Sequence, residues 1–559
     1  MKFKSLCFIV LLSFIFPSML LSSTEDGDNM NKPLIVFHID LNSVALKESY
    51  IKKWLKKASD MGYNAVLWEV ENEIKWQTCP ECVSPDAFSK DEFKKLLSYS
   101  RSLGLQPIPL LQTVGHAEYV LSHKKYFSFR EDTSRYDCYA TCKPEVKKFL
   151  KDWIKEYLEL FGDIKYFHLG GDEAYVFATS PECSAEAKKI GKGKLYAEYM
   201  KDISQPLLEK RIRPCIWDDM ILHYTDALPV IPKQFVIWDW NYWDGDSTPQ
   251  KVMLWEKSGY VTKGQVTDEI KKEFPEITDN NGNLRAFYTS DVLKRLGFDV
   301  MLCSSSRSHG DAVFAGREPL HASNIIGAAK KVVEDNLLGT CVTSWAVRIP
   351  NYETQETWFY LAPLTINNSK LSYDELLSKS CEYTFGVSNT EAEKAFENIG
   401  YPFPFVDQSS TGIGWTGMKD SRSAPPGYIN SLIEKWKNKN GEKLWKDNIS
   451  LVQASTEKIS EGINELNNFI PKAEKGLDVL EAWKKAAYFQ YWGSIIAIEI
   501  VNNEESKPVK NKTEILSLLK NLRSDYKNWA KYWMTPTSAE TNTGLIYDAI
   551  INYFESLHK

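Results

Sequence analysis

"IKYFHLGGDE", from Ile164 to Glu173, is the stretch that decides the fold. Its apolar, branched and aromatic residues follow a helix-like segment, and this pattern predicts a buried β-strand that stops at two glycines. Asp172 and Glu173 come directly after the glycines, at the carboxyl end of the strand. Burying an ionised carboxylate without a partner is costly, so two adjacent carboxylates at this position require an explanation.

Strand-like segments recur along the chain on both sides of this stretch. Amphipathic helical patterns separate most of them, and several of these end in glycine, as helices often do. The connection after the sixth strand is long and irregular. An open doubly wound sheet is the competing architecture, but no phosphate-binding glycine-rich turn follows the first strand. The alternation predicts an α/β fold, a (β/α)8 TIM barrel over residues 33–365. Its strands begin near Pro33, Tyr63, Gln106, Ile164, Arg213, Phe235, Asp299 and Gly339.

The carboxyl ends of the predicted strands carry polar residues. In a barrel these ends converge on one mouth, where barrel enzymes hold their active sites. We therefore expect a common pocket surrounded by Asp40, Glu71, His116, Asp172, Glu173, Asp218, Asp219, Asp239 and Arg348.

The rhythm of strands stops at the end of the predicted barrel. Residues 401–428 are rich in glycine, proline and serine and predict a long loop, either a linker or a lid. Beyond them, apolar residues recur at spacings typical of one helix face. We expect residues 366–559 to form a mostly α-helical C-terminal domain, with a helix face made by Val452, Ile459, Ile463, Leu466 and Ile470.

Composition and the first residues constrain partners and location. The 559-residue chain has a net charge of −6, a pI near 5.9 and no basic run, which argues against nucleic acid as a partner. Residues 1–23 combine a basic start, an apolar stretch and a small-residue region, a pattern that predicts a secretory signal peptide. We expect a secreted or periplasmic protein without a membrane span after signal removal; an uncleaved anchor is the alternative.

The cysteines allow several interpretations. Cys79 and Cys82, like Cys138 and Cys142, are closely spaced in predicted loops, and the four thiols could hold a structural zinc ion. Local disulfides and free thiols are the simpler alternatives, and we predict no metal site. Three cysteines within predicted strands are most simply small buried hydrophobic residues: Cys215, Cys303 and Cys341.

The adjacent carboxylates suit one kind of glycosidic chemistry. Conventional hydrolysis uses an acid and a second carboxylate roughly 5 to 9 Å apart across the sugar, which neighbouring residues supply poorly. With Glu173 as the acid, the 2-acetamido group of the substrate is the natural nucleophile, and Asp172 would hold its N–H. The structural alternative is that the two carboxylates form a salt bridge or cap a helix.

The motif "HLGGDE" (His168 to Glu173) resembles the catalytic signature of glycoside hydrolase family 20, the β-N-acetylhexosaminidases. "PLLQTVGHAEYVL", "WEVENE" and "WDDM" at other strand ends resemble the hexosaminidase D-like branch of that family. The resemblance covers residues 33–365. It implies an exo-acting, retaining β-N-acetylhexosaminidase that releases terminal β-linked GlcNAc or GalNAc from glycans through an oxazolinium intermediate. It implies no metal and no organic cofactor.

Carried over by position, the resemblance makes Asp172 the residue that orients the acetamido group and Glu173 the acid and base. It assigns the Tyr hydroxyl that grips the acetamido oxygen to Tyr242, with Tyr352 as the alternative. The remaining pocket residues that the resemblance implies are His116, Trp217, Asp218, Trp238 and Trp345. The structural alternatives are a buried supporting role for His116 and packing of the barrel core for Trp217.

Two departures from the family pattern affect substrate preference. The first-strand Arg that many members use to hold sugar hydroxyls is missing from "VFHIDLNS", and the usual Trp-then-acid pattern after the eighth strand is replaced by "SWAVRIPNYE". Glu353 and Arg348 are the candidate substitutes. The sequence does not determine the preference for GlcNAc or GalNAc, the linkage, the natural glycan or the oligomeric state. It also does not determine whether a residue such as Arg307 binds a sulfate or other decoration.

Two other functions compete with the hexosaminidase. A secreted, non-catalytic sugar-binding barrel predicts loss of the acid or of the acetamido holder, yet both carboxylates are present. A glycosidase of the conventional double-displacement type would use Glu71 or Asp218 as the nucleophile and would cleave sugars without an acetamido group.

Overall fold

The computed structural model describes residues 32–42, 44–245, 247–308, 311–345, 349–401, 442–504, 506–507 and 511–557. The predicted signal peptide, nearly all of the predicted loop 401–428 and Arg348 lie outside the described residues. The chain divides into two compact units, Met1–Lys32 and Pro33–Lys559, and every element described belongs to the second.

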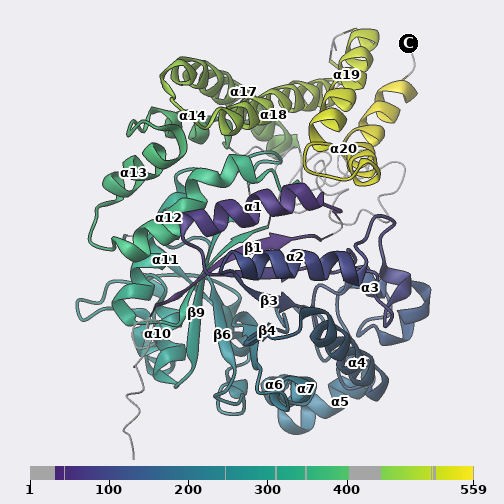
Figure 1. Ribbon diagram of the computed structural model, residues 1–559, viewed down its shortest axis with the longest axis vertical. Coiled ribbons are helices and arrows are strands. Elements are labelled where there is room, and N and C mark those ends of the chain that lie inside the picture. Colours follow the sequence, from purple (N-terminus) through teal and green to yellow (C-terminus); the bar gives the residue numbers. More distant parts are fainter. Residues whose placement is uncertain are drawn as a thin grey trace, which may run out of the picture. The chain divides into compact units, whose positions relative to one another are not determined.

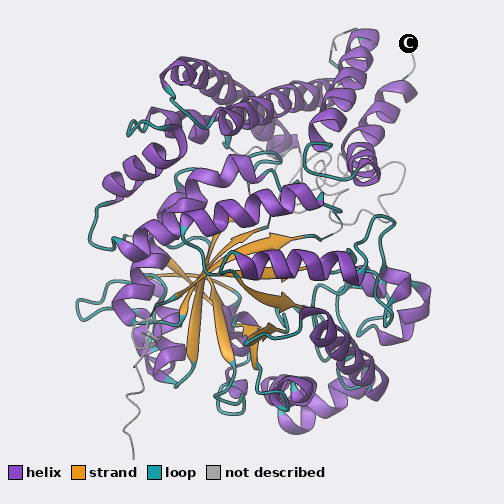
Figure 2. Cartoon of the chain, in the orientation of Figure 1, coloured by secondary structure: helices purple, strands orange, loops and turns teal. Residues whose placement is uncertain are grey.

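Eight parallel strands close into a barrel, which confirms the predicted fold class (Figures 1 and 2). Around the barrel each strand pairs with the next barrel strand along the chain, so β6 pairs with β9, and β10 closes the ring by pairing with β1. The strands are β1 (Leu34–Asp40), β2 (Ala65–Glu69), β3 (Gln106–Leu110), β4 (Tyr166–His168), β5 (Arg213–Trp217), β6 (Val236–Trp240), β9 (Asp299–Arg307) and β10 (Gly339–Ser344).

The strands alternate between the barrel interior and the surrounding helices, as a period of two residues requires. In β1, Val36 belongs to the interior cluster, whereas Phe37 and Ile39 belong to the cluster that packs against the helices. The three strand cysteines are buried in the interior cluster, as predicted. That cluster consists of Val36, Ala65, Leu67, Ile108, Leu110, Cys215, Trp217, Val236, Trp238, Met301, Cys303 and Cys341.

Helices surround the barrel in the order that the sequence pattern predicts. Local signals set their ends: Ser89 and Glu92 form a capping box at the start of α2, and Gly62 ends α1 in the left-handed conformation. The helices up to the end of the barrel are α1 (Glu48–Met61), α2 (Lys90–Ser102), α3 (Glu118–Leu121), α4 (Pro144–Phe161), α5 (Pro181–Ile190), α6 (Lys192–Ile203), α7 (Gln205–Leu208), α8 (Asp219–His223), α9 (Asp268–Glu273), α10 (Tyr288–Arg295), α11 (Leu320–Asp335) and α12 (Glu356–Asn367).

The long connection after the sixth strand contains a hairpin that the sequence pattern did not reveal. β7 (Lys251–Leu254) pairs antiparallel with β8 (Gly259–Thr262), outside the barrel sheet. Trp255, between these strands, packs its ring 4.8 Å from that of Trp240 at the end of β6. The insertion therefore supports an aromatic residue at the carboxyl end of the barrel.

The described part of the chain after the barrel is helical. Val452, Ile459 and Leu466 are buried, as expected for the core face of α17. The proposed domain boundary at residue 365 lies within α12 and stays a prediction. No described helix combines the length and apolar character needed to span a bilayer. The helices are α13 (Tyr373–Phe385), α14 (Glu391–Ile399), α17 (Glu442–Phe469), α18 (Leu477–Glu504), α19 (Lys512–Ala530) and α20 (Pro536–Ser556).

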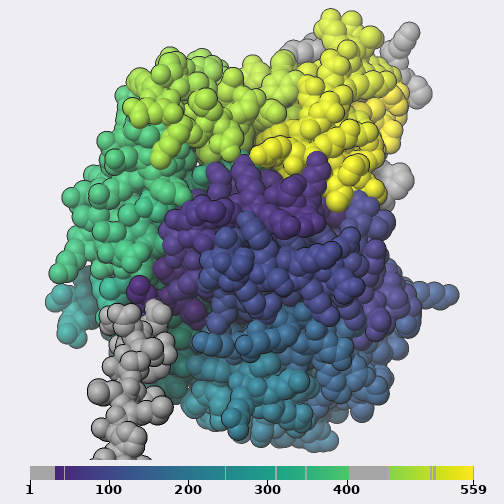
Figure 3. Space-filling view, in the orientation of Figure 1, coloured from purple at the N-terminus to yellow at the C-terminus, as the bar shows by residue number. Residues whose placement is uncertain are grey.

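The C-terminal helices pack directly on barrel elements. The Lys47 N–H, just before α1, donates to the Trp533 carbonyl (2.8 Å), and Phe314 packs against Phe489 of α18 at 5.4 Å between ring centroids. Figure 3 shows the C-terminal residues (yellow) against the α1 segment (purple). These helices therefore bury part of the barrel's surface.

The two loop cysteine pairs differ from each other. Cys79 and Cys82 form a local disulfide, one of the simpler alternatives to zinc. Cys138 and Cys142 are free thiols, and the Cys142 N–H donates to the sulfur of Cys183 (3.3 Å). In the described ranges, no three or more His, Cys, Asp or Glu side chains gather as a metal would require. The Cys79–Cys82 disulfide takes two of the four thiols, which contradicts the zinc interpretation.

Candidate active site

The loop after β4 carries the two adjacent carboxylates, and its glycines are required by close contacts. Gly170 and Gly171 have φ angles of 63° and 95°, a region that favours glycine. A Cβ atom on Gly170 would lie 2.1 Å from Gln112 Oε1, and one on Gly171 would lie 2.5 Å from the Tyr196 hydroxyl. Only glycine therefore lets the chain turn here and place Asp172 and Glu173 at the barrel mouth.

A histidine from the third strand's loop holds both carboxylates. His116 Nε2 lies 3.2 Å from Asp172 Oδ2 and 3.4 Å from Glu173 Oε2. About a third of the His116 and Glu173 side chains is exposed, whereas Asp172 is 13% exposed. His116 and Glu173 have φ angles of 53° and 45°, which are strained for residues with a side chain. Strained backbone that supports an accessible ion-pair cluster is typical of a functional site.

Neighbouring charges tune the site. Burial alone would lower the pKa of His116, but the carboxylates of Asp172 and Glu173 raise it well above its usual range. Burial raises the pKa of Asp172, with His116 opposing and Glu173 adding to that shift. The buried Asp219 side chain accepts a hydrogen bond from the Glu173 N–H (2.9 Å), and burial raises its pKa well above the ordinary value. Asp219 therefore anchors the strained backbone of Glu173.

A second group of predicted pocket residues joins the loop after β6 to the end of β10. Trp345 Nε1 donates to the Tyr242 hydroxyl (2.8 Å), and the ring centroids of Trp240 and Tyr242 are 5.2 Å apart. The two predicted acetamido-pocket residues, Tyr242 and Trp345, thus lie side by side. Trp240 extends this aromatic wall and was not predicted, although it sits in the same "WDWNYW" segment.

Trp217 and Trp238 line the barrel interior below this wall. Each is 1% exposed, and both pack against the ring of His168. Trp217 also lies 6.1 Å from Trp345 between ring centroids. They therefore form the base on which the pocket is built, and their contact with substrate stays a prediction.

The predicted pocket residue Asp218 is fully buried. Its Oδ1 accepts the Trp240 N–H (3.1 Å), and burial together with Asp239 raises its pKa well above the ordinary value. Burial also raises the pKa of Asp239 to about 7, against the hydrogen bonds from Thr289 and Asp218. In the described structure Asp218 thus supports the aromatic wall.

A buried polar network missed at the sequence level links both sides of the pocket. The Ser344 N–H donates to His38 Nδ1 (3.2 Å), so His38 Nε2 carries the proton and donates to Glu69 Oε2 (3.3 Å). Glu69 Oε1 accepts from Gln112 Nε2 (3.0 Å), and the His38 ring packs against Trp345 at 4.7 Å. The network thereby connects Trp345 with Gln112, against which Gly170 packs. Polar residues at the alternate, inward-facing positions of neighbouring strand ends were the sequence signal that could have revealed this network.

Two candidates from the eighth-strand segment lie outside the pocket. Tyr352 stacks on Tyr50, with 6.0 Å between ring centroids, in the core between β1 and the helices. Glu353 is 3% exposed and pairs with Lys53 of α1 (2.9 Å). Both proposed roles are wrong, because the chain after β10 turns these side chains toward α1. The other candidate, Arg348, lies outside the described residues.

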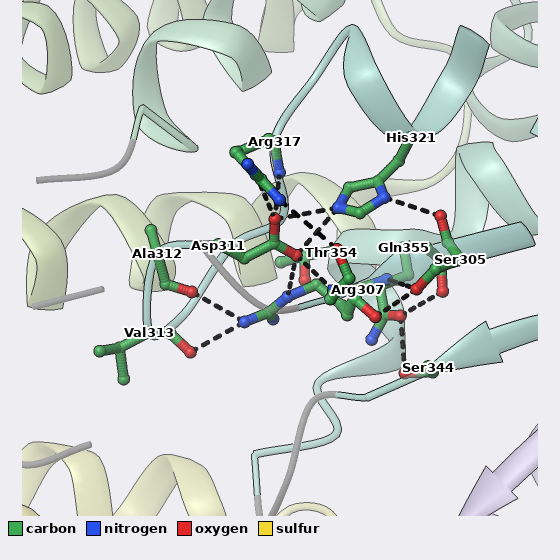
Figure 4. A network of polar contacts seen from close by, with 12 residues as sticks. Ser305, Arg307, Asp311, Ala312, Val313, Arg317, His321, Ser344, Thr354 and Gln355 are labelled. Carbon is green, nitrogen blue, oxygen red and sulfur yellow. Dashed lines mark hydrogen bonds and ion pairs between the residues drawn. The ribbon is translucent and has the colours of Figure 1, made fainter. Parts of the chain in front are cut away.

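Arg307 is not exposed to a substrate decoration, because its side chain is fully buried in a polar network (Figure 4). Its guanidinium donates to the carbonyls of Ala312 and Val313 and lies 3.3 Å from Asp311. Burial would raise the pKa of Asp311, but His321 and the two arginines hold it well below its usual range. Arg317 completes the network with a 2.8 Å contact to Asp311. The cluster fixes the loop that follows β9.

The fold and the site together define a parallel barrel with a strained, partly exposed carboxylate pair at its mouth, the arrangement of a barrel hydrolase. Residues 53–262 match the model of "Glycosyl hydrolase family 20, catalytic domain". The matched region thus resembles a family 20 catalytic domain of a glycoside hydrolase, in agreement with the family predicted from the motifs.

Curated relatives support the same branch. The chain is 27% identical to human Hexosaminidase D over 231 residues, covering 39% of this chain and 47% of that protein. It is 26% identical to bovine Hexosaminidase D over 189 residues, covering 33% and 55%. The chain thus spans about half the length of these relatives. Lacto-N-biosidase from Bifidobacterium bifidum is 24% identical over 230 residues, covering 39% and 20%.

Two solved structures illustrate the likeness in fold. The β-N-acetylhexosaminidase from Bacteroides fragilis is 17% identical, with a TM-score of 0.44, covering 60% of this chain and 66% of that one. Dispersin B is 16% identical, with a TM-score of 0.40, covering 60% and 98%.

Proposed function

We propose that this protein is an exo-acting, retaining β-N-acetylhexosaminidase that releases terminal β-linked GlcNAc or GalNAc from glycans. One observation carries the proposal: the Asp172 and Glu173 carboxylates both lie within 3.4 Å of His116 at the carboxyl end of the barrel. Adjacent carboxylates held by one imidazole leave little room for a sugar between them. This favours a mechanism in which the substrate supplies the nucleophile.

In the first step, Glu173 protonates the glycosidic oxygen while the acetamido carbonyl oxygen attacks the anomeric carbon. The bond to the leaving group breaks, and an oxazolinium ion forms. Asp172 accepts a hydrogen bond from the acetamido N–H and balances the positive charge that develops on the ring. The Tyr242 hydroxyl, which accepts a hydrogen bond from Trp345, is the proposed donor to the acetamido oxygen.

In the second step, the Glu173 carboxylate takes a proton from water. The water oxygen attacks the anomeric carbon and reopens the oxazolinium ring, so the product keeps the β configuration. Glu173 then carries the proton needed for the next cycle. The strained backbone of Glu173, bonded to Asp219, keeps the carboxyl in one position through both steps.

The setting of this reaction is proposed as extracellular or periplasmic. The leader-like residues 1–23 support export, and a glycan with a terminal N-acetylhexosamine is the expected partner. Neither step requires a metal or an organic cofactor.

The test is hydrolysis of the nitrophenyl β-glycosides of GlcNAc, GalNAc and glucose by the parent and by Asp172→Asn and Glu173→Gln. We expect cleavage of the acetamido sugars alone and severe loss in both variants. Their ratio in the parent measures the epimer preference. Cleavage of the plain glucoside would instead indicate double displacement, and binding without turnover of any substrate would indicate a sugar-binding barrel.

A further inference from the structure

Two cysteines that the proposed mechanism does not use meet between the loop after β3 and the start of α5. The Cys142 N–H donates to the Cys183 sulfur (3.3 Å), and the Thr141 hydroxyl lies 3.9 Å from the same sulfur. The Cys142 Cα atom is one bond from that nitrogen, so it lies within about 5 Å of the Cys183 sulfur. Disulfides join residues whose Cα atoms are about 4.4 to 6.8 Å apart, and the contact is compatible with such a bridge.

The surroundings of these thiols favour reaction between them. Cys183 is the third residue of the ten-residue helix α5, and the N-terminus of a helix stabilises a thiolate. The neighbouring Cys142 thiol lowers the pKa of Cys183, against the effect of burial, whereas Cys183 raises the pKa of Cys142. Cys183 is fully buried but Cys142 is partly exposed, so a reagent from solvent reaches Cys142 first.

We propose that Cys142 and Cys183 are a disulfide-forming pair, oxidised by a small-molecule disulfide. The Cys142 thiolate attacks one sulfur of the small disulfide, which gives a mixed disulfide and releases one small thiolate. The Cys183 thiolate then attacks the Cys142 sulfur, forms the protein disulfide and releases the second small thiolate. Each cysteine gives up its proton, and the two electrons that the pair loses reduce the small disulfide to two thiols.

The bridge would link two segments that support the candidate active site. The Tyr139 N–H donates to the Val114 carbonyl (3.0 Å), so the end of the loop after β3 holds the chain close to His116. The Ser180 N–H, just before α5, donates to the Glu131 side chain (2.9 Å) of the same loop. A disulfide would make this junction covalent. It would close a segment of 41 residues and thereby reduce the conformational entropy of the unfolded chain.

Cys138 is the competing partner for either thiol. It is buried, and its thiol donates to the Tyr139 carbonyl (3.7 Å). The Cys183 sulfur instead accepts from the backbone of Cys142, so the structure assigns the bridge to Cys142 and Cys183. Cys138→Ser is therefore the matched control for Cys142→Ser.

The test is peptide mapping of the full chain after incubation with oxidised glutathione. The remaining thiols are alkylated, and the peptides are analysed by mass spectrometry without reduction. We expect a cross-linked peptide pair containing Cys142 and Cys183 in the parent and in Cys138→Ser, and its loss in Cys142→Ser. A bridge from Cys138 in the parent, or alkylation of both Cys142 and Cys183 after oxidation, would overturn the proposal.

The thermal midpoint gives a second measurement. Reduction with a phosphine should lower the midpoint of the oxidised parent by about 2 to 4 °C more than that of Cys142→Ser treated in the same way. Both proteins contain the Cys79–Cys82 disulfide, so the effect of reducing that bond cancels in the comparison. Equal shifts would overturn the stabilising role of the bridge. Neither measurement depends on hydrolysis, so a failure of the proposed function would be seen separately.

Discussion

Two clusters at the carboxyl end of the barrel each pair a histidine with at least one carboxylate, and they differ in exposure. His116 and Glu173 each expose about a third of their side chains, on a backbone strained at both residues. Arg307, Asp311 and His321 are fully buried. The first cluster is open to a substrate, whereas the second is enclosed by the loop after β9.

The comparison shows that residue type and strand-end position do not separate catalysis from structure. In both clusters a carboxylate meets a cation at hydrogen-bonding distance. Only accessibility and strained backbone distinguish them.

The largest expected effect is on catalysis in the open cluster. Glu173→Gln keeps the size of the side chain but cannot transfer the proton, so kcat for a nitrophenyl N-acetylhexosaminide should fall about 10³-fold or more. The thermal midpoint should stay close to that of the parent, measured by circular dichroism. A parent-like kcat would remove Glu173 from the chemistry.

Asp311→Ala should show the reverse pattern in the enclosed cluster. Removing the carboxylate leaves the buried Arg307 guanidinium without its ion pair, which should cost about 3 kcal/mol of unfolding free energy, measured by chemical denaturation. Glu81→Gln is the control, because Glu81 pairs with Lys125 at the surface (2.8 Å) and should cost less than about 1 kcal/mol. The activity per folded molecule should be preserved. A loss of kcat without a loss of stability would contradict a purely structural role for the enclosed cluster.

A smaller effect is expected from the polar network between the two sides of the pocket. Glu69→Gln replaces one carboxylate oxygen with an amide N–H, which then faces the N–H donor of either His38 or Gln112. This mismatch of two donors should lower kcat/KM about tenfold. The double change Glu69→Gln with Gln112→Glu restores a complementary donor and acceptor, so it should recover most of that loss. Absence of recovery would argue against the network as a positioning device.

The smallest effects are in the pH dependence of stability, and the two clusters should differ in sign. The raised pKa of His116 stabilises the fold below about pH 6.5, and this contribution is lost as pH rises through the raised value. The lowered pKa of Asp311 stabilises the fold above about pH 3.9, and this contribution is lost as pH falls through the lowered value.

Denaturation midpoints across pH, compared with His116→Gln and Asp311→Asn, measure these two contributions. His116→Gln should flatten the alkaline side of the profile, and Asp311→Asn the acid side. If His116→Gln instead flattened the acid side and Asp311→Asn the alkaline side, the two ion pairs would not stabilise the fold in the way that their distances indicate.

The predictable parts of this protein were those that depend on local pattern. Strand and helix periodicity predicted all eight barrel strands, and the glycines before Asp172 marked the loop that the structure places at the mouth. The resemblance to family 20 assigned Tyr242 and Trp345 to the acetamido pocket, and the structure shows the two side chains in contact. Each of these depends on residues near in sequence or on a fold whose strand ends must converge.

The parts that failed depend on where a side chain points after a strand ends. Tyr352 and Glu353 turn to α1, and Arg307 turns into its own loop, although all three follow barrel strands. The hairpin of β7 and β8 was hidden in an irregular connection. No local signal determines these directions, because packing partners far away in the sequence select them.

By itself, the sequence determined that this chain folds as a barrel with an aspartate–glutamate pair at one strand end, because periodicity and glycine placement are local properties. Only the tertiary structure decided which polar residues share that pocket. It brought His116 against Asp172 and Glu173, joined His38, Glu69 and Gln112 from three strands, and enclosed Arg307. The physical reason is that burial and hydrogen-bond partners arise from segments that meet only when the barrel closes.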